Sequence, residues 1–265
     1  MNNFRQPGFI LGLIVIAIAI IASLAPGVLA THDPFQSVAT DRLLPPSAQY
    51  LFGTDNLGRD LYSRVVHGAA LSLLSASLAV VVGVVVGALF GLISGFIGGR
   101  TDFVIMRFVD VLIAVPGVLL ALIVVASLGF GPLSLALGVG LGAAGSFARV
   151  MRSQVIRISH EEYVEAARTL GVRSPAILLQ HVLPNAARPV IAMAALEMGT
   201  AILAVSALTF LGFGAPPPAP EWGALVSAGR DYVATNPGLS IIPGAVILAV
   251  VLAVNRVARA IGGDE

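Results

Sequence analysis

Charged side chains are scarce in this sequence: Asp, Glu, Lys and Arg together make up 11% of its 265 residues. A soluble domain carries roughly 25% charged residues. The hydrophobic share is 57% and the mean hydropathy is +0.94, so a water-soluble fold would expose large apolar patches. The low charge and high hydropathy exclude a soluble domain and a disordered chain, and they indicate an integral membrane protein.

Cysteine and lysine are absent. Without cysteine the chain has no disulfide framework, no thiolate metal site and no cysteine nucleophile. The 15 basic residues, all arginine, are too few for a nucleic-acid surface. The four histidines form no spacing typical of a metal site, so no metal is expected. A phosphate-binding Walker A loop is also missing, so we expect the chain itself to bind neither ATP nor any other cofactor.

Long uncharged runs predict six membrane-spanning helices, since about 20 mostly apolar residues cross a bilayer. The expected spans are 9–29, 69–97, 103–129, 133–150, 189–214 and 239–257. The first run is longer than the roughly 7–15 apolar residues of a signal peptide, so an uncleaved helix is expected. Kinks are expected at Pro116, Pro189 and Pro243. The fold class is therefore all-α integral membrane.

Arginine is distributed unevenly between the two sides of these spans. With the N-terminus inside, only Arg42, Arg59, Arg64 and Arg230 of the 15 basic residues lie outside. This bias predicts that both termini are cytoplasmic. We divide the chain into a first helix with an extracytoplasmic loop, 1–67, and a five-helix core, 68–265.

The loop at 151–188 is expected in the cytoplasm and is the most polar part of the chain. Ser159 and Glu162 have the spacing of a capping box, which predicts a short helix from Ser159 onward. Gly171 is expected to end that helix as a left-handed cap. Four residues at helical spacing form its apolar face: Tyr163, Ala166, Ala167 and Leu170.

A second short helix is predicted after Gly171. Ser174 would be its N-cap and Pro175 its first residue, and the helix would end by Pro184. Helical pattern alone leaves two readings of this pair of helices. They lie in the lipid headgroups, or they contact a partner protein.

The residues themselves resemble a known family. Glu165-Ala166-Ala167, Gly171 and His181-Val182-Leu183-Pro184 resemble the EAA loop of binding-protein-dependent ABC importer permeases. The segments 53–60, 208–214 and 217–223 resemble the dipeptide, oligopeptide and nickel branch, and within it the shorter DppC/OppC-type subunit. The tail after Asn255 departs from the family pattern.

This resemblance implies a type I ABC importer permease (MetI-like) fold of six helices. It implies a non-enzymatic subunit in the inner membrane of a prokaryote that forms half of a pathway for di- or oligopeptides. The implied partners are a DppB/OppB-type second permease, two ATPase subunits or one fused ATPase that bind ATP and Mg²⁺, an extracytoplasmic substrate-binding protein, and the lipid bilayer. Two alternatives stay open: a permease for nickel or another small solute, and a stand-alone ion-coupled transporter.

The resemblance also implies which residues contact the ATPase. They are Tyr163, Glu165, Ala166, Ala167, Leu170, Gly171, His181 and Pro184. Glu165 is expected to pair with a basic group of the ATPase, and the small Ala side chains would allow close packing.

Small and acidic residues within the spans mark further candidate sites. Glycine recurs every fourth residue in the second span, at Gly83, Gly87, Gly91 and Gly95. Such a stripe lets a helix approach closely, either from this subunit or from a partner permease. Acidic residues within a membrane are costly and tend to mark a pathway or a partner.

Two spans carry an acidic residue. Arg107 lies one turn before Asp110, which predicts an ion pair between them. Glu197 has no basic neighbour in sequence, so it is the stronger candidate for the pathway or for a polar contact between helices.

Overall fold

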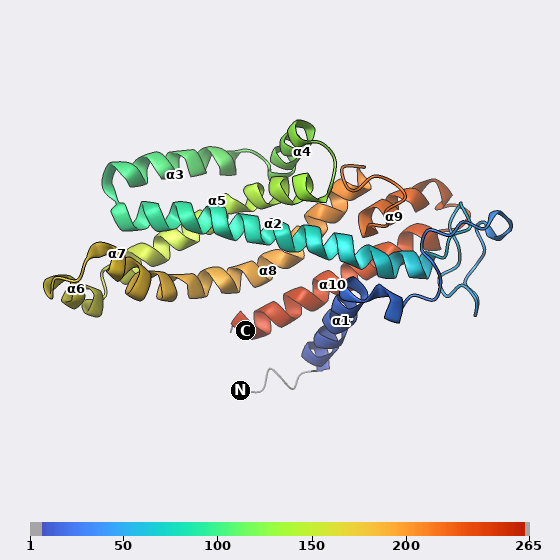
Figure 1. Cartoon of the computed structure of the whole chain (residues 1–265), viewed down its shortest axis with the longest axis horizontal. Helices are drawn as coiled ribbons and strands as arrows, with labels where there is room; N and C mark the ends of the chain where they lie inside the picture. The colour runs from blue at the N-terminus through green and yellow to red at the C-terminus, as the bar shows by residue number, and fades with distance from the viewer. Residues whose placement is uncertain (1–6, 263–265) are drawn as a thin grey trace.

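The computed structural model describes residues 7–262, and these are helical with connecting turns and loops (Figure 1). The long helices are α1 (Pro7–Leu24), α2 (Leu61–Ile97), α5 (Pro132–Ser159), α8 (Leu183–Phe210) and α10 (Gly238–Gly262). The shorter ones are α3 (Gly99–Ala114), α4 (Gly117–Leu128), α6 (Glu162–Thr169), α7 (Ser174–Ile177) and α9 (Trp222–Gly229). Single 3₁₀ turns lie at Pro26–Val28, Ala39–Asp41 and Arg230–Tyr232, and a π-helical turn at Leu178–Val182.

Five of the described helices are long and apolar enough to cross a membrane, and α3 with α4 makes a sixth crossing if the pair counts as one. The third predicted span is broken at the expected kink rather than only bent, because α3 and α4 meet at an angle of 93°. Pro116 has no N–H and disfavours helical geometry at the residue before it. Val115 is accordingly extended, with ψ 125°. The first helix also ends earlier than predicted, at Leu24.

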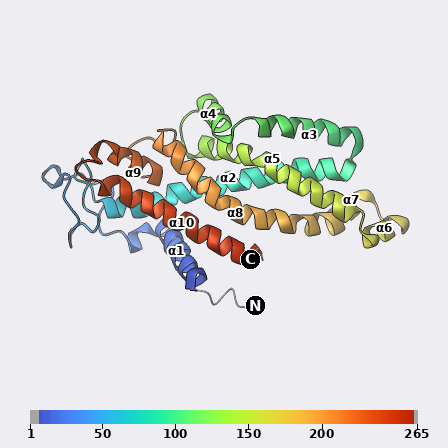
Figure 2. The same cartoon turned by 180° about the vertical axis from the view of Figure 1, so that it is seen from behind.

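The centre of the molecule is the lengthwise packing of α2 against α5, visible from both sides (Figures 1 and 2). The glycine stripe of α2 makes this contact. A Cβ on Gly87 or Gly91 would overlap the carbonyl oxygens of Ala144 and Ala148, and one on Gly95 would lie 2.9 Å from the Arg152 oxygen. The stripe therefore faces a helix of this same chain.

The remaining long helices pack around this pair. α8 crosses both α2 and α5, and α10 lies between α8 and α1. Gly199 of α8 faces Asn255 of α10 so closely that a Cβ would overlap the amide oxygen. Gly12 of α1 faces Ala253, where a Cβ would lie 3.4 Å from the carbonyl oxygen. The start of α1 and the end of α10 consequently lie on the same side of the bundle (Figure 2).

The bundle has two dissimilar ends. The turn that carries α6 and α7 projects from one end, and the loop 31–60 with α9 covers the other (Figure 1). The candidate functional residues lie in three places: the α6 end, a groove halfway along the bundle, and the loop-covered end.

Candidate functional site

The helix α6 has one fully buried side chain, that of Val164. It packs in a cluster with Val155 and Ile158 of α5, Ile177 of α7, and Val182. The predicted apolar face gave no sign of this contact, because Val164 lies outside the Tyr163, Ala166, Ala167, Leu170 pattern. The available signal was a valine flanked by the pair Glu161-Glu162 on one side and by Glu165 on the other.

The predicted capping box is wrong. Ser159 is the last residue of α5, its hydroxyl is buried, and α6 begins at Glu162 with Glu161 as an extended N-cap that makes no side-chain cap. The buried position of Ile158 keeps α5 helical through Ser159, so Ser159 cannot adopt the extended geometry that an N-cap requires.

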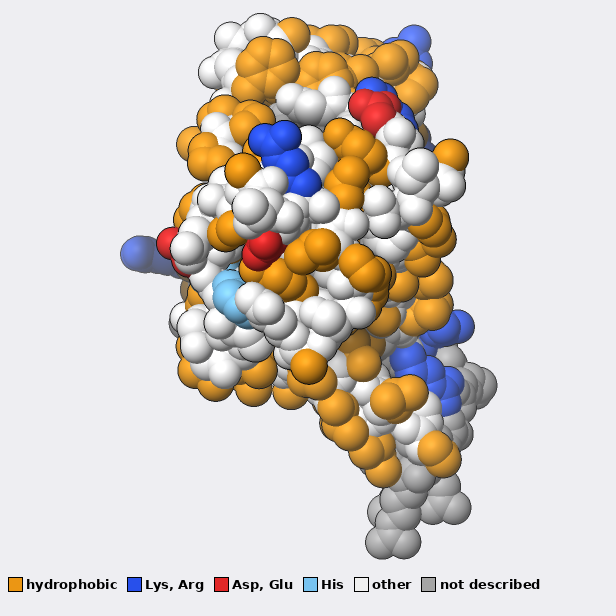
Figure 3. Space-filling view, turned by 90° about the vertical axis from the view of Figure 1, so that its right-hand side faces the viewer, with side chains coloured by type: hydrophobic (Ala, Val, Ile, Leu, Met, Phe, Trp, Pro, Cys, Tyr) orange, Lys and Arg blue, Asp and Glu red, His pale blue; other side chains and the backbone are white. Residues whose placement is uncertain are grey.

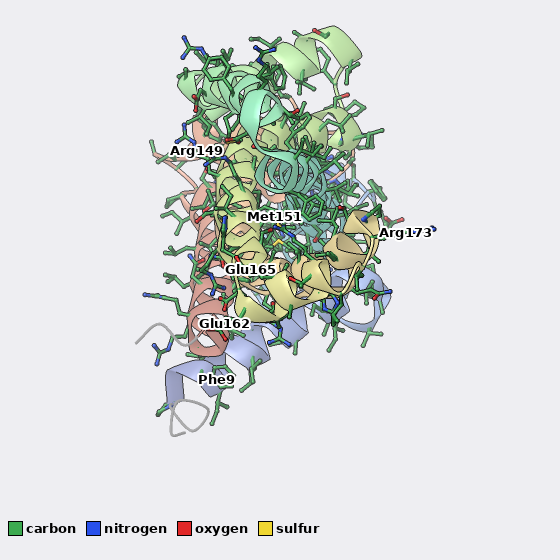
Figure 4. All side chains as sticks on the ribbon, turned by 90° about the vertical axis from the view of Figure 1, so that its left-hand side faces the viewer. Phe9, Arg149, Met151, Glu162, Glu165 and Arg173 are labelled. Atoms are coloured by element: carbon green, nitrogen blue, oxygen red, sulfur yellow. The ribbon has the colours of Figure 1, made fainter. Side chains whose placement is uncertain are left out.

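The predicted apolar face of α6 points mostly away from the bundle. Leu170 is 84% exposed and Tyr163 47% exposed. Ala166 is exposed as well, and only Ala167 is half-buried against the cluster around Val164. Figure 4 views this end directly, with α6 lying across it, Glu162 and Glu165 on one side and Arg173 on the other. The α6 face thus presents apolar surface that the described part of this chain does not cover.

Gly171 ends α6 in a Schellman motif. Its φ is +80°, its N–H donates to the Arg168 oxygen at 3.0 Å, and the Val172 N–H donates to the Ala167 oxygen at 3.1 Å. This pairing satisfies carbonyls that the helix end leaves free. Since a side chain is strained at this φ, glycine is what the turn requires.

The second predicted helix is longer than expected and starts differently. Its N-cap is the extended Arg173, so Ser174 is already helical, and the helix passes through Pro184 into α8. The π-helical turn at Leu178–Val182 ends two residues before Pro184, which lacks an N–H for regular α-helical pairing. The resulting helix runs without a break from Ser174 to Phe210.

Three polar residues join α6 to this second helix. The rings of Tyr163 and His181 meet edge to face at 6.2 Å. The Asn185 amide donates to the His181 carbonyl at 2.7 Å and to the Tyr163 hydroxyl at 3.4 Å. Tyr163 and His181, distant in sequence, therefore lie at one junction, while Glu165 and Pro184 are exposed beside it.

Two ion pairs connect α3 to α5. Asp110 binds Arg149 at 2.8 Å, so the predicted pair with Arg107 is wrong. Asp102 binds Arg152 through two bonds, at 2.5 and 2.6 Å, and also accepts from Ser94. Helix packing brings α5 alongside α3. Because Arg149 is far from Asp110 in the sequence, spacing along the chain could not identify it as the partner of Asp110.

Glu197 lies near the middle of α8 and lines a groove between α4, α5 and α8. The groove has a volume of about 290 Å³. Its other lining residues are small or apolar: Gly117, Val118, Ala121, Val139, Gly142, Ala143, Ser146, Thr200, Ala201, Ala204 and Leu208. Asp110 does not line it. Of the two acidic residues in predicted spans, only Glu197 faces this groove.

The opposite end of the molecule is fixed by buried polar contacts. Asp60 caps α2 by accepting from the Ser63 N–H at 2.9 Å. Arg64 is buried, lies 3.7 Å from Asp55 and donates to the Pro34 carbonyl at 2.9 Å. Charged and histidine side chains are visible among hydrophobic ones on this end (Figure 3). The loop 31–60 is therefore tied to the start of α2.

The segment around α9 is anchored in the same way. The Trp222 indole donates to the Val65 carbonyl at 2.9 Å, and its backbone N–H donates to Ser72 at 3.0 Å. Burial raises the pKa of the neighbouring Glu221, partly opposed by a hydrogen bond from the Ala215 N–H. Both loops at this end thus dock onto α2. In residues 7–262 there is no cluster of His, Asp or Glu that could hold a metal ion.

A bundle of membrane-length helices, with a groove halfway along it and a small helix projecting from one end, is the architecture of a multi-pass membrane protein. Solved structures share this fold. One is a chain of the inward-facing MetNI methionine ABC transporter, with TM-score 0.62 and 16% identity, covering 76% of this chain and 95% of the other. Another is a chain of an amino acid ABC transporter, with TM-score 0.58 and 15% identity, covering 76% and 94%.

The chain belongs to the family of binding-protein-dependent transport system inner membrane components, whose model matches residues 87–263. It is 38% identical over 94% of its length to the dipeptide transport system permease protein DppC of Alkalihalophilus pseudofirmus, covering 82% of that protein. It is 36% identical over 94% to the probable D,D-dipeptide permease DdpC of Escherichia coli K12, covering 84%. It is 43% identical over 79% to the glutathione permease GsiD of Shigella flexneri, covering 69%.

The family assignment fixes the class of function. The chain is a multi-pass inner membrane protein and the permease subunit of an ABC importer. It is not an enzyme, since ATPase activity resides in separate subunits.

Proposed function

We propose that this permease carries di- or oligopeptides and forms half of their pathway across the membrane. The relatives named for dipeptide transport match 94% of the chain, so the likeness includes the groove and both ends of the bundle. The groove at Glu197 supports the proposal because its walls are mostly small residues, which leave room for cargo with varied side chains.

The coupling of transport to ATP hydrolysis runs through α6. The main supporting observation is the α6 face: Leu170, the C-cap of this short helix, is 84% exposed, and Val164 is the one fully buried residue of the helix. An exposed apolar face at the tip of a projecting turn fits a groove on a partner protein. Glu165 is exposed next to this face, and we expect its carboxylate to form an ion pair with a basic group of the ATPase. If α6 lay in the lipid headgroups instead, the turn at Gly171 would not need a fixed shape.

The remaining partners follow from the two ends of the molecule. A second permease would complete the pathway, and ATP and Mg²⁺ would be bound by one or two ATPase subunits at the α6 end. A substrate-binding protein would dock on the loops 31–60 and 215–238 at the other end. The arginine bias supports a cytoplasmic position for α6 and for both termini, and α10 runs away from the loop-covered end (Figure 1).

A reconstitution experiment tests this proposal. The chain, its partner permease, the ATPases and the binding protein are placed in proteoliposomes, and uptake of a radiolabelled dipeptide is measured. Uptake that requires ATP and the binding protein supports the proposal. Uptake without an ATPase would instead support a stand-alone transporter, and nickel uptake without peptide uptake would support the small-solute alternative.

A further inference from the structure

The groove at Glu197 has an unusual charge pattern. Glu197 is the sole ionisable side chain that lines it, and the other polar side chains there are the hydroxyls of Ser146 and Thr200. The bend between α3 and α4 brings Gly117 into the groove beside Gly142, where a Cβ on Gly142 would lie 3.3 Å from the Gly117 Cα. The groove is thus lined mostly by small residues, with a few larger apolar ones, and it carries one carboxylate.

Within residues 7–262, no hydrogen bond or ion pair of the Glu197 carboxylate is formed with another residue. The side chain is half-buried. The nearby arginines of α5 are engaged elsewhere, Arg149 with Asp110 and Arg152 with Asp102. A carboxylate near the middle of a membrane span is costly unless a cation or donor meets it.

The shape of the groove indicates which cation this is. Alanine and glycine walls offer no pocket for a particular side chain, so they do not select cargo by its side chains. A free peptide has one cationic group that does not vary with its sequence, the α-ammonium group. An ammonium donates up to three hydrogen bonds, and a carboxylate accepts them in charge-assisted geometry.

We propose that the Glu197 carboxylate binds the α-ammonium group of the peptide during its passage through the groove. This inference rests on the proposed function, since it requires peptide cargo. Glu197 would then contact the substrate directly. The small residues of α4 and α5 would face the side chains of the peptide and leave room for side chains of different sizes.

The first test is peptide uptake by the complete complex in proteoliposomes. Glu197→Gln keeps the shape and removes the charge, and we expect uptake at saturating dipeptide to fall about tenfold. Glu197→Asp keeps the charge and should retain most uptake. Assembly of the complex and its ATPase activity stimulated by the binding protein should persist in both variants. Uptake by Glu197→Gln within twofold of wild type would overturn the inference and leave the proposed function standing.

Two other outcomes of the uptake experiment distinguish failure of the inference from failure of the proposed function. If Glu197→Gln fails to assemble with the partner permease while Glu197→Asp assembles, Glu197 pairs with that subunit and the inference is wrong. If wild type itself takes up no peptide, the proposed function fails, and the inference fails with it.

The second test uses the absence of cysteine from this chain. Thr200→Cys lines the groove and leaves the Glu197 carboxylate in place. This variant is treated in the assembled complex with a water-soluble methanethiosulfonate reagent, and modification of this chain is followed by mass spectrometry. We expect modification that is slower when dipeptide is present, and we expect Glu197→Gln added to Thr200→Cys to abolish the slowing. Leu203→Cys, on another side of α8 and outside the groove, provides the comparison. Equal slowing by dipeptide with and without the Glu197 carboxylate would contradict the proposed contact.

Discussion

Asp102 of α3 and Arg152 of α5 form a two-point ion pair, with Nε 2.5 Å from one carboxylate oxygen and Nη2 2.6 Å from the other. The same carboxylate accepts a hydrogen bond from Ser94 of α2. One acidic side chain therefore joins three helices where the α2–α3 turn meets α5.

The Asp102–Arg152 pair should contribute measurably to stability. Asp102→Asn should lower the free energy of unfolding by about 1–2 kcal/mol, because it removes a partly exposed bidentate pair. Thermal unfolding of the purified chain in detergent checks this. The double variant Asp102→Asn with Arg152→Gln should lose little more than either single variant. Fully additive losses would show that the pair does not act as a unit.

The glycine stripe should be intolerant of even one methyl group. Gly91→Ala places a Cβ against the Ala148 carbonyl, and we expect overpacking to cost about 1–3 kcal/mol. Gly244→Ala is the matched control, since a Cβ there meets nothing within 4 Å and Gly244 also lies in a long helix. Folded yield and the thermal midpoint are measured for both. Equal behaviour of the two variants would contradict the tight α2–α5 contact.

The Gly171 turn should be needed for coupling more than for folding. Its φ of +80° strains any β-branched side chain, so Gly171→Val should retain membrane insertion but reduce dipeptide uptake and ATPase capture. Gly171→Asn is the control, because asparagine tolerates left-handed geometry better than other side chains. Uptake in proteoliposomes and pull-down of the ATPase are the measurements. Unchanged uptake by Gly171→Val would mean that the turn geometry does not matter.

Stability should depend on pH through Glu221. Burial raises its pKa in the folded chain above the usual 4.5, so the folded state favours the protonated form. This contribution is fully present below the unfolded pKa and is lost as the pH rises through the folded pKa. We therefore expect the thermal midpoint of Glu221→Gln to gain on that of wild type as the pH rises from about 4.5. A difference that is constant with pH would contradict the shift.

Much of this architecture could be predicted from the sequence because it depends on local pattern. The apolar runs are long and uninterrupted, and Gly171 follows a short amphipathic repeat, so the helices and the turn were predictable. The glycine stripe required a close neighbour, but its period could not identify α5 as that neighbour.

The features that could not be predicted depend on packing between segments that are distant in the sequence. Arg149, not Arg107, pairs with Asp110 because α5 lies alongside α3. Val164 is buried because its cluster is assembled from four other segments of the chain: α5, α7, the π-helical turn and α8. Ser159 stays in α5 because Ile158 is buried, which overrides the capping signal. Pro116 indicated a kink, but neither the 93° angle between α3 and α4 nor the packing of α4 on α5 could be predicted from one proline.

The most direct test of the account is dipeptide uptake by the complete complex carrying Leu170→Arg. This change places a charge on the most exposed apolar residue of α6 and leaves Val164 in its buried contact. The account predicts normal insertion and normal assembly with the partner permease, together with loss of ATPase pull-down and of ATP-driven uptake. Wild-type uptake with Leu170→Arg would contradict the claim that α6 couples this permease to its ATPase.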